Sequence, residues 1–327
     1  MIRSLDRGAV LARAALLSIS LTMTLAACGG SDDPPQPQLT LAGALDHPGA
    51  PTLSDIQAQP PITQTVSFTS GAGSQTHTYT GASLWGVLTN AGIQVDAARK
   101  NDVLNRYVLA TGSDGYKTVF TLGEINPDFG NRPSIVAYAE TTGGASAALT
   151  ADGPFRVTAP GDVKGGRYVS NLVKLDVRSS GSTVAASGGG VSTQFVVSGA
   201  VQRPGTYDLA ALQALPVVTR TVGTATYTGV SLYDFLNTTV GLVTNPAVKN
   251  DSLGLYVVAT GGDGYKAAFA VGELDPGFGN QPDLIAYAQN GAPLTTTGFA
   301  RIVVPNDIKA GRYVSNLIAI EVFAAAP

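Results

Sequence analysis

Two stretches of the chain carry a carboxylate, a phenol and an amine in the same order and spacing. The residues are Asp114, Tyr116 and Lys117 in the first stretch, and Asp263, Tyr265 and Lys266 in the second. A hairpin that presents these groups could contact a polar ligand. Alternatively, Asp-Gly forms the turn between two strands and Tyr packs on the sheet. We favour the second interpretation, and the residues alone leave both open.

Four arginines also recur at matching places. Two of them precede a proline that ends a strand, and two lie in Gly-Arg-Tyr; they are Arg156, Arg301, Arg167 and Arg312. Guanidinium groups that converge on one mouth would suit a phosphate or a carboxylate. The alternative is pairing at the surface with Asp162 and Asp307.

The residue types that are scarce exclude several kinds of site. Cys28 is the only cysteine, so an intrachain disulfide is impossible, and thiolate catalysis is not expected in the folded part. The two histidines, His47 and His77, both lie in the first half, which excludes a repeated histidine site. No phosphate-binding loop, nucleophile elbow or metal-spaced His/Glu set occurs.

The first residues predict export. Three arginines precede the apolar run 14–25, which is too short to span a membrane. The sequence 25–29, Leu-Ala-Ala-Cys-Gly, resembles the lipobox of bacterial lipoproteins. The resemblance implies a signal peptide at 1–27 and a lipid on Cys28, which would anchor the protein in the cell envelope, facing the periplasm or the exterior. An ordinary signal peptide is the alternative.

The mature chain is acidic. Removing residues 1–27 leaves 17 basic and 22 acidic residues, a net charge of −5. Without a basic stripe, this argues against nucleic acid as a partner. The expected partners are the membrane, through the lipid anchor, and an unidentified small ligand or envelope protein.

The rest of the chain is a tandem duplication. Five blocks recur in the same order, at offsets of 145 to 149 residues; the clearest pair is 109–117 with 258–266. A period this long indicates tandem domains and not a solenoid. We expect a flexible tether at 28–38, a first domain at 39–178, a Ser/Gly/Ala linker at 179–193 and a second domain at 194–323.

Each copy is predicted to be α+β, a mixed β domain with few peripheral helices. Alternation over Tyr168–Val177 predicts a strand with Val169, Val173, Leu175 and Val177 on one face. Further strands are expected at 107–111, 118–122 and 135–139. Ser231 and Ser83 can each cap a helix that ends near Gly241 or Gly92, and a shorter helix at 209–215 stops at Pro216.

The order of these landmarks resembles the molybdopterin-binding domain of the sulfite oxidase family. The second copy carries most of them, as the segments 199–216, 229–232, 263–265, 284–287, 290–294 and 301–305. The first copy follows the same course more loosely. The resemblance implies two tandem sulfite oxidase-like domains, molybdopterin as a cofactor and oxidoreductase chemistry.

The family's metal chemistry does not transfer to this sequence. Its molybdenum is held by a cysteine thiolate, and the corresponding strands, read as Val66–Ser70 and Val218–Val222, have none. Ser70 is a weak candidate ligand. The lysine of the family's last strand falls on Ser170 and Ser315, which puts cofactor phosphate contacts in doubt.

Three functions therefore compete. We expect a non-catalytic envelope lipoprotein that binds a small anion or a protein, with no cofactor. The first alternative is a periplasmic molybdopterin-dependent oxidoreductase with an atypical metal ligand. The second is a structural or adhesion module. The sequence leaves open whether the chain is an enzyme, and the missing thiolate argues against enzymatic activity.

Overall fold

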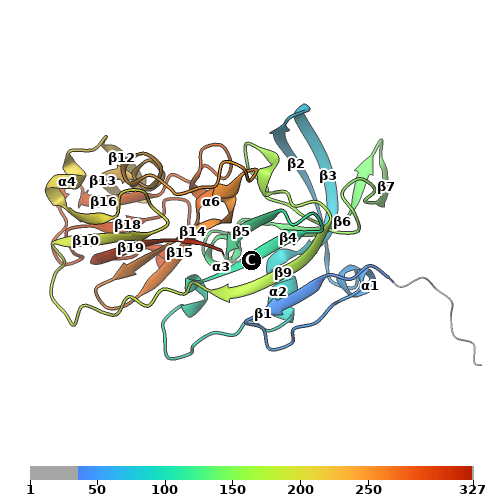
Figure 1. The fold of residues 1–327 in the computed structure, drawn as a ribbon, viewed down its shortest axis with the longest axis horizontal. Coiled ribbons are helices and arrows are strands. Elements are labelled where there is room, and N and C mark those ends of the chain that lie inside the picture. Colours follow the sequence, from blue (N-terminus) through green and yellow to red (C-terminus); the bar gives the residue numbers. More distant parts are fainter. Residues whose placement is uncertain (1–35, 326–327) are drawn as a thin grey trace, which may run out of the picture. The chain divides into compact units, whose positions relative to one another are not determined.

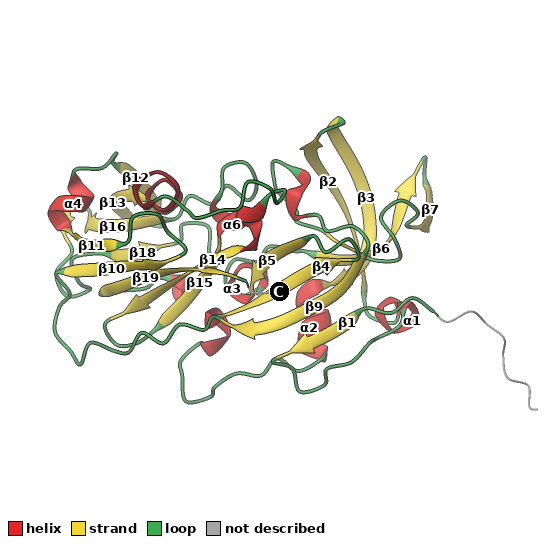
Figure 2. Ribbon diagram, viewed as in Figure 1, coloured by secondary structure: helices red, strands yellow, loops and turns green. Residues whose placement is uncertain are grey.

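A computed structural model describes residues 36–325. The predicted signal peptide, Cys28 and most of the tether lie outside the described residues. Within them, nineteen strands form four sheets joined by short helices (Figures 1 and 2). The predicted α+β class is confirmed.

The first half contains two sheets. One has the strand order β1-β9-β4-β5, with bounds β1 Thr40–Gly43, β9 Leu172–Ser179, β4 Arg106–Gly112 and β5 Lys117–Thr121. The other has the order β2-β3-β6-β7, with β8 beside β6; the bounds are β2 Pro61–Ser70, β3 Gly73–Ser83, β6 Ile135–Thr142, β7 Ala145–Ala148 and β8 Arg156–Val157. In the first sheet β1 runs parallel to β9, and β9 and β5 are antiparallel to β4.

The second half repeats this arrangement. Its first sheet has the order β11-β10-β19-β14-β15, with bounds β11 Gly205–Asp208, β10 Gln194–Gly199, β19 Leu317–Ala324, β14 Leu255–Gly261 and β15 Lys266–Ala270. Its second sheet has the order β12-β13-β16-β17, with β18 beside β16; the bounds are β12 Val218–Val222, β13 Ala225–Ser231, β16 Leu284–Gln289, β17 Ala292–Pro293 and β18 Arg301–Val303.

Short helices connect the strands at matching places. They are α1 Leu53–Gln57, α2 Leu84–Asn90 and α3 Leu122–Ile125 in the first half, and α4 Leu209–Gln213, α5 Leu232–Asp234 and α6 Val271–Leu274 in the second. Ser83 and Ser231 are N-caps, as predicted, because their hydroxyls accept from the backbone amides of Gly86 and Asp234. The helix after Ser231 departs from the prediction, since α5 continues as a π-helix to Val240.

Each half has its own hydrophobic core, and a third cluster joins the halves. The third cluster comprises Tyr107, Leu109, Val119, Tyr256, Val258 and Ala270, from β4, β5, β14 and β15. The rings of Tyr107 and Tyr256 lie 4.3 Å apart. The equivalent sheets of the two copies therefore pack directly on each other through matching strands.

The prediction for Tyr168–Val177 was partly wrong. The strand begins at Leu172, after a 3-10 turn at Gly165–Arg167. Val173 is 40% exposed, because a bulge pairs Gly112 with Leu172 and Thr111 with Lys174 and leaves Val173 unpaired. Leu172 takes the core position that the alternation assigned to Val173.

Within residues 36–325, no helix combines the length and the apolar character needed to cross a membrane.

Candidate functional site

Arg167 lies at the centre of a buried ion cluster and not at a surface mouth. Its Nε and Nη2 donate to the two carboxylate oxygens of Asp162, at 2.8 and 2.7 Å, and its Nη1 donates to Glu124 Oε1 at 2.5 Å. The three side chains are almost completely buried. The sequence offered pairing of Arg167 with Asp162 as an alternative. That pairing is present, but the expectation that it lies at the surface was wrong.

Arg312 repeats this cluster in the second copy. It donates to both oxygens of Asp307, at 2.9 and 2.5 Å, and to Glu273 Oε1 at 2.5 Å. Each arginine also lies against a glycine of the other copy. A Cβ on Gly272 would lie 2.7 Å from Arg167 Cδ, and a Cβ on Gly123 would lie 2.6 Å from Arg312 Cδ. These arginines hold the interface between the copies.

The interface contains more carboxylates than it can pair. Burial raises the pKa of Glu124 to about 7, against the attraction of Arg167. Burial also raises the pKa of Asp283 well above its ordinary value, and neither of its carboxylate oxygens has a hydrogen-bond partner among the described residues. The first copy has Ser134 at the place of Asp283, since the carbonyl of Ser134 accepts from Leu84, the first residue of α2, as that of Asp283 accepts from Leu232, the first residue of α5.

The two Asp-Gly-Tyr hairpins form turns and also contact the other copy. Asp114 Oδ1 accepts from the Tyr116 amide at 2.9 Å, and Gly115 has φ 82°, as the predicted turn requires. The Tyr116 hydroxyl donates to the Gly166 carbonyl and accepts from Asn250 of the second copy. Tyr265 makes the equivalent bonds to the Gly311 carbonyl and to Asn101.

A cavity of about 670 Å³ opens beside the hairpin of the first copy. Asp114, Tyr116, Arg156 and Ser70, all candidates from the sequence, line it. Lys117, Arg167, Arg301 and Arg312 line neither this cavity nor the pocket in the second copy described below.

Arg156 is held rigidly at the wall of this cavity. It pairs with Asp152 and donates to the Tyr79 hydroxyl at 2.9 Å. Its guanidinium carbon lies 5.3 to 5.8 Å from the ring centres of Phe68, Tyr79 and Tyr168. Arg301, the counterpart of Arg156, lies over only two rings, those of Tyr227 and Tyr313. Thr297 stands where the first copy has Asp152.

The third ring comes from an extension of the β2–β3 hairpin. Ile62 pairs with Gly81 in the first copy and Val218 pairs with Gly229 in the second, so Val218–Val222 correspond to 62–66. The correspondence of Val218–Val222 with Val66–Ser70 read from the sequence is therefore wrong by four residues. The hairpin tip, which carries Phe68 and Ser70, exists only in the first copy.

Two lysines that motif reasoning missed complete the cavity wall. Lys164 and Lys249 line the cavity, and within residues 36–325 neither has a carboxylate at ion-pair distance. Lys309, the counterpart of Lys164, pairs with Asp128 of the other copy at 2.6 Å. The counterpart of Asp128 in the second copy is Gly277, which lies beside Lys164 and has no side chain to pair with it. Comparing the copies at this position would have revealed the difference.

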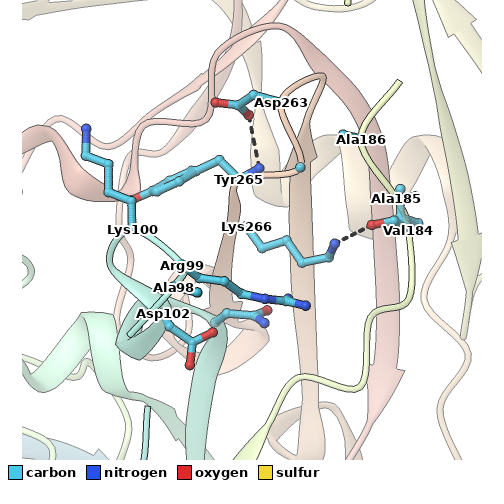
Figure 3. A pocket seen from close by; sticks show the side chains of 12 residues that line it. Ala98, Arg99, Lys100, Asp102, Val184, Ala185, Ala186, Asp263, Tyr265 and Lys266 are labelled. Carbon is cyan, nitrogen blue, oxygen red and sulfur yellow. Dashed lines mark hydrogen bonds between the residues drawn. The ribbon is translucent and has the colours of Figure 1, made fainter. Parts of the chain in front are cut away.

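The equivalent mouth of the second copy is covered by the segment that joins the copies (Figure 3). A smaller pocket of about 410 Å³ remains there. It is lined by Val184, Ala185 and Ala186, by the candidates Asp263, Tyr265 and Lys266, and by residues of the first copy that include Arg99 and Lys100. The Lys266 ammonium donates to the Val184 carbonyl, and burial lowers the pKa of this lysine.

The donor set of the cavity does not fit a thiolate-bound molybdenum. Cys28 lies outside the described residues, and the Ser70 hydroxyl is at an exposed hairpin end, where it accepts from the Ala72 amide at 3.1 Å. In the described part of the chain, no group of three or more His, Cys, Asp or Glu residues could hold a metal ion. The residues present supply no soft ligand.

Comparison with known proteins gives a fold-level likeness only. No family model matches the chain, and no curated protein matches it. Among solved structures, the sulfane dehydrogenase SoxCD from Paracoccus pantotrophus is similar at 14% identity and a TM-score of 0.36. The match covers 69% of this chain and 57% of that chain, so this chain spans little more than half of the enzyme's length. A likeness at this level carries no argument about activity.

Proposed function

We propose that this chain is a non-catalytic lipoprotein of the bacterial cell envelope whose first copy binds a small anion. The observation that carries the proposal is a pair of lysines at the cavity of the first copy, Lys164 and, from the second copy, Lys249, that lack carboxylate partners among residues 36–325. An ammonium group at a cavity wall forms strong, charge-assisted hydrogen bonds with carboxylate, phosphate or sulfate. Arg156 is already neutralised by Asp152 and serves as a fixed wall.

The size and the lining of the cavity support a small ligand. Its volume of about 670 Å³ is typical of small-molecule sites. Tyr168 and Phe68 supply apolar surface, and the backbone at Gly165–Gly166 permits close approach. This combination suits a ligand with one or two anionic groups on a compact apolar body.

Calorimetric titration of the purified full chain with phosphate, sulfate and short dicarboxylates tests the proposal. We expect at least one of these anions to bind, and Lys164→Gln to weaken that binding about tenfold, because one charge-assisted hydrogen bond is lost. Lys309→Gln is the matched control and leaves the affinity unchanged. No binding by any anion, or equal losses in both variants, would overturn the proposal.

The absence of catalysis by a metal has its own test. Metal and pterin analysis of protein isolated from a molybdate-fed native strain is expected to find no stoichiometric molybdenum. Stoichiometric molybdenum that is lost in Ser70→Ala would establish the oxidoreductase alternative.

The envelope anchor rests on the sequence 25–29. Membrane fractionation of the native host is expected to place the chain in the membrane fraction and to release Cys28→Ser to the soluble fraction. Equal fractionation of both forms would contradict lipid attachment at this cysteine.

A further inference from the structure

The segment before β10 lies along the second copy and bends at residues 188–190, three glycines with φ angles of 79°, 113° and 88°. Its carbonyls at Val184 and Gly190 accept from Lys266 Nζ and from Asn316 Nδ2. Its amides at Ser187 and Ser192 donate to the Gly262 carbonyl, at 2.9 Å, and to Asn316 Oδ1, at 2.6 Å. Three of these four contacts are made to main-chain groups by side chains and the fourth joins two main-chain groups, so they recognise the backbone of the segment, and the positive φ of residues 188–190 favours glycine there.

The first copy presents the same groups without a segment on them. Lys117, the Ser113 carbonyl and the Asn171 side chain match Lys266, Gly262 and Asn316, and within residues 36–325 they have no hydrogen-bond partners. A Cβ on Gly264 would lie 3.4 Å from Ala186 Cβ, whereas a Cβ on the matching Gly115 would meet no atom within 4 Å. Among residues 36–325, no segment covers in the first copy the place that residues 184–192 cover in the second.

The first described residue of the chain that enters β1 does not make the equivalent contacts. Thr40 pairs with Lys174 as Val196 pairs with Ala319, which makes Gln36 the counterpart of Ser192. Gln36 Oε1 accepts from the Ser54 amide at 3.3 Å, and the Pro37 carbonyl accepts from the Leu53 amide at 2.9 Å. The chain at Gln36 is therefore directed to α1, whereas Ser192 is bound to Asn316.

We propose that the first copy binds a glycine-containing segment of a partner protein along Ser113, Lys117 and Asn171. The segment is rich in small, uncharged residues, because the one that occupies the second copy has Ala185, Ala186 and the run 188–190 of glycines at this place. One bond is not conserved: the Phe299 amide donates to the Ser192 carbonyl, and Pro154 at the matching place has no N–H. Asn171 also lines the anion cavity, so the two sites adjoin, and the proposal holds whether or not an anion occupies that cavity.

A labelled synthetic peptide with the sequence of residues 182–193 is the probe. Fluorescence anisotropy with the full chain is expected to show saturable binding in trans. The same peptide with proline in place of Ser187 and Ser192 lacks two donors and is expected to bind about tenfold more weakly, because each bond contributes modestly.

Two glycine variants locate the site. Asn171 and Asn316 both have positive φ, 49° and 52°, which glycine adopts without strain, so the substitutions remove the amide and preserve the turn. Asn171→Gly is expected to weaken peptide binding about tenfold, and Asn316→Gly is expected not to weaken it. Absence of saturable binding, binding that Asn171→Gly leaves unchanged, or loss confined to Asn316→Gly would each overturn the proposal.

Discussion

The two copies differ most at the mouth beside each Asp-Gly-Tyr hairpin. The mouth of the first copy is a cavity lined by Lys164 and by Lys249, which the second copy contributes; neither has an ion-pair partner within residues 36–325, and a longer β2–β3 hairpin adds Phe68 to the wall. In the second copy the joining segment covers the hairpin, and Lys309 is neutralised by Asp128. The tyrosines and arginines that maintain the contact between the copies are retained in both. The duplication has thus preserved the interface while the two mouths have diverged.

The largest effect is expected from the buried arginines. Arg312→Met leaves Glu273 and Asp307 buried without a cation, which should lower the free energy of unfolding by about 3–5 kcal/mol. Arg167→Met should cost somewhat less, because Asp283 faces Arg312 and has no counterpart in the first copy. Urea denaturation of both variants measures this, and losses below about 1 kcal/mol would show that the clusters do not hold the interface.

A smaller gain is expected when Asp283 is replaced by the residue of the other copy. Asp283→Ser removes a buried carboxylate without partners and should raise the free energy of unfolding by about 1–3 kcal/mol. The reciprocal Ser134→Asp should lower it. The comparison is contradicted if Asp283→Ser destabilises the protein.

An aspartate at position 277 should make the cavity of the first copy resemble the mouth of the second, in which Lys309 is paired with Asp128. A Cβ on Gly277 would lie 3.4 Å from Lys164 Nζ, so Gly277→Asp gives this lysine the partner that Asp128 gives Lys309. Anion affinity should fall about tenfold, because the ligand must displace a carboxylate. Asp128→Gly, the reciprocal change, should leave the affinity of the first cavity unaltered in the same titration.

The smallest effect is a pH dependence that arises from Glu124 in the first cluster. The pKa of Glu124 is raised from 4.5 to about 7, so between these values the folded chain retains a proton that the unfolded chain has released. The free energy of unfolding should therefore fall as pH rises from about 4.5 to 7. Asp176, whose pKa is lowered, changes stability only below its ordinary value of 3.8, outside this window. A stability that increases with pH from 4.5 to 7 would contradict the assignment.

Local chemistry in the sequence predicted the elements well. The hydroxyl caps at Ser83 and Ser231, the turn at Asp114-Gly115 and the strands at 107–111 and 135–139 depend on neighbouring residues, and the structure contains each of them. The alternation failed at Val173, because a bulge depends on the partner strand and not on the sequence of β9.

The site was only half predictable. Asp114, Tyr116 and Arg156 were candidates, and the structure gathers them at one cavity. Lys164 and Lys249 carry no motif; what sets Lys164 apart is the absence of an acid at Gly277, in the other copy. Arg167 and Arg312 are recurrent guanidinium groups in the sequence, and only the packing of one copy on the other makes them buried interface residues.

Crystals of the full chain soaked in selenate test the central claim most directly, because anomalous scattering locates the anion. The account predicts a selenate within hydrogen-bond distance of the ammonium groups of Lys164 and Lys249 at the cavity of the first copy. It predicts none at the mouth of the second copy, between Lys309 and Lys100, the counterparts of Lys164 and Lys249. A selenate bound at the second mouth alone, or at neither, would contradict the assignment of anion binding to the first copy.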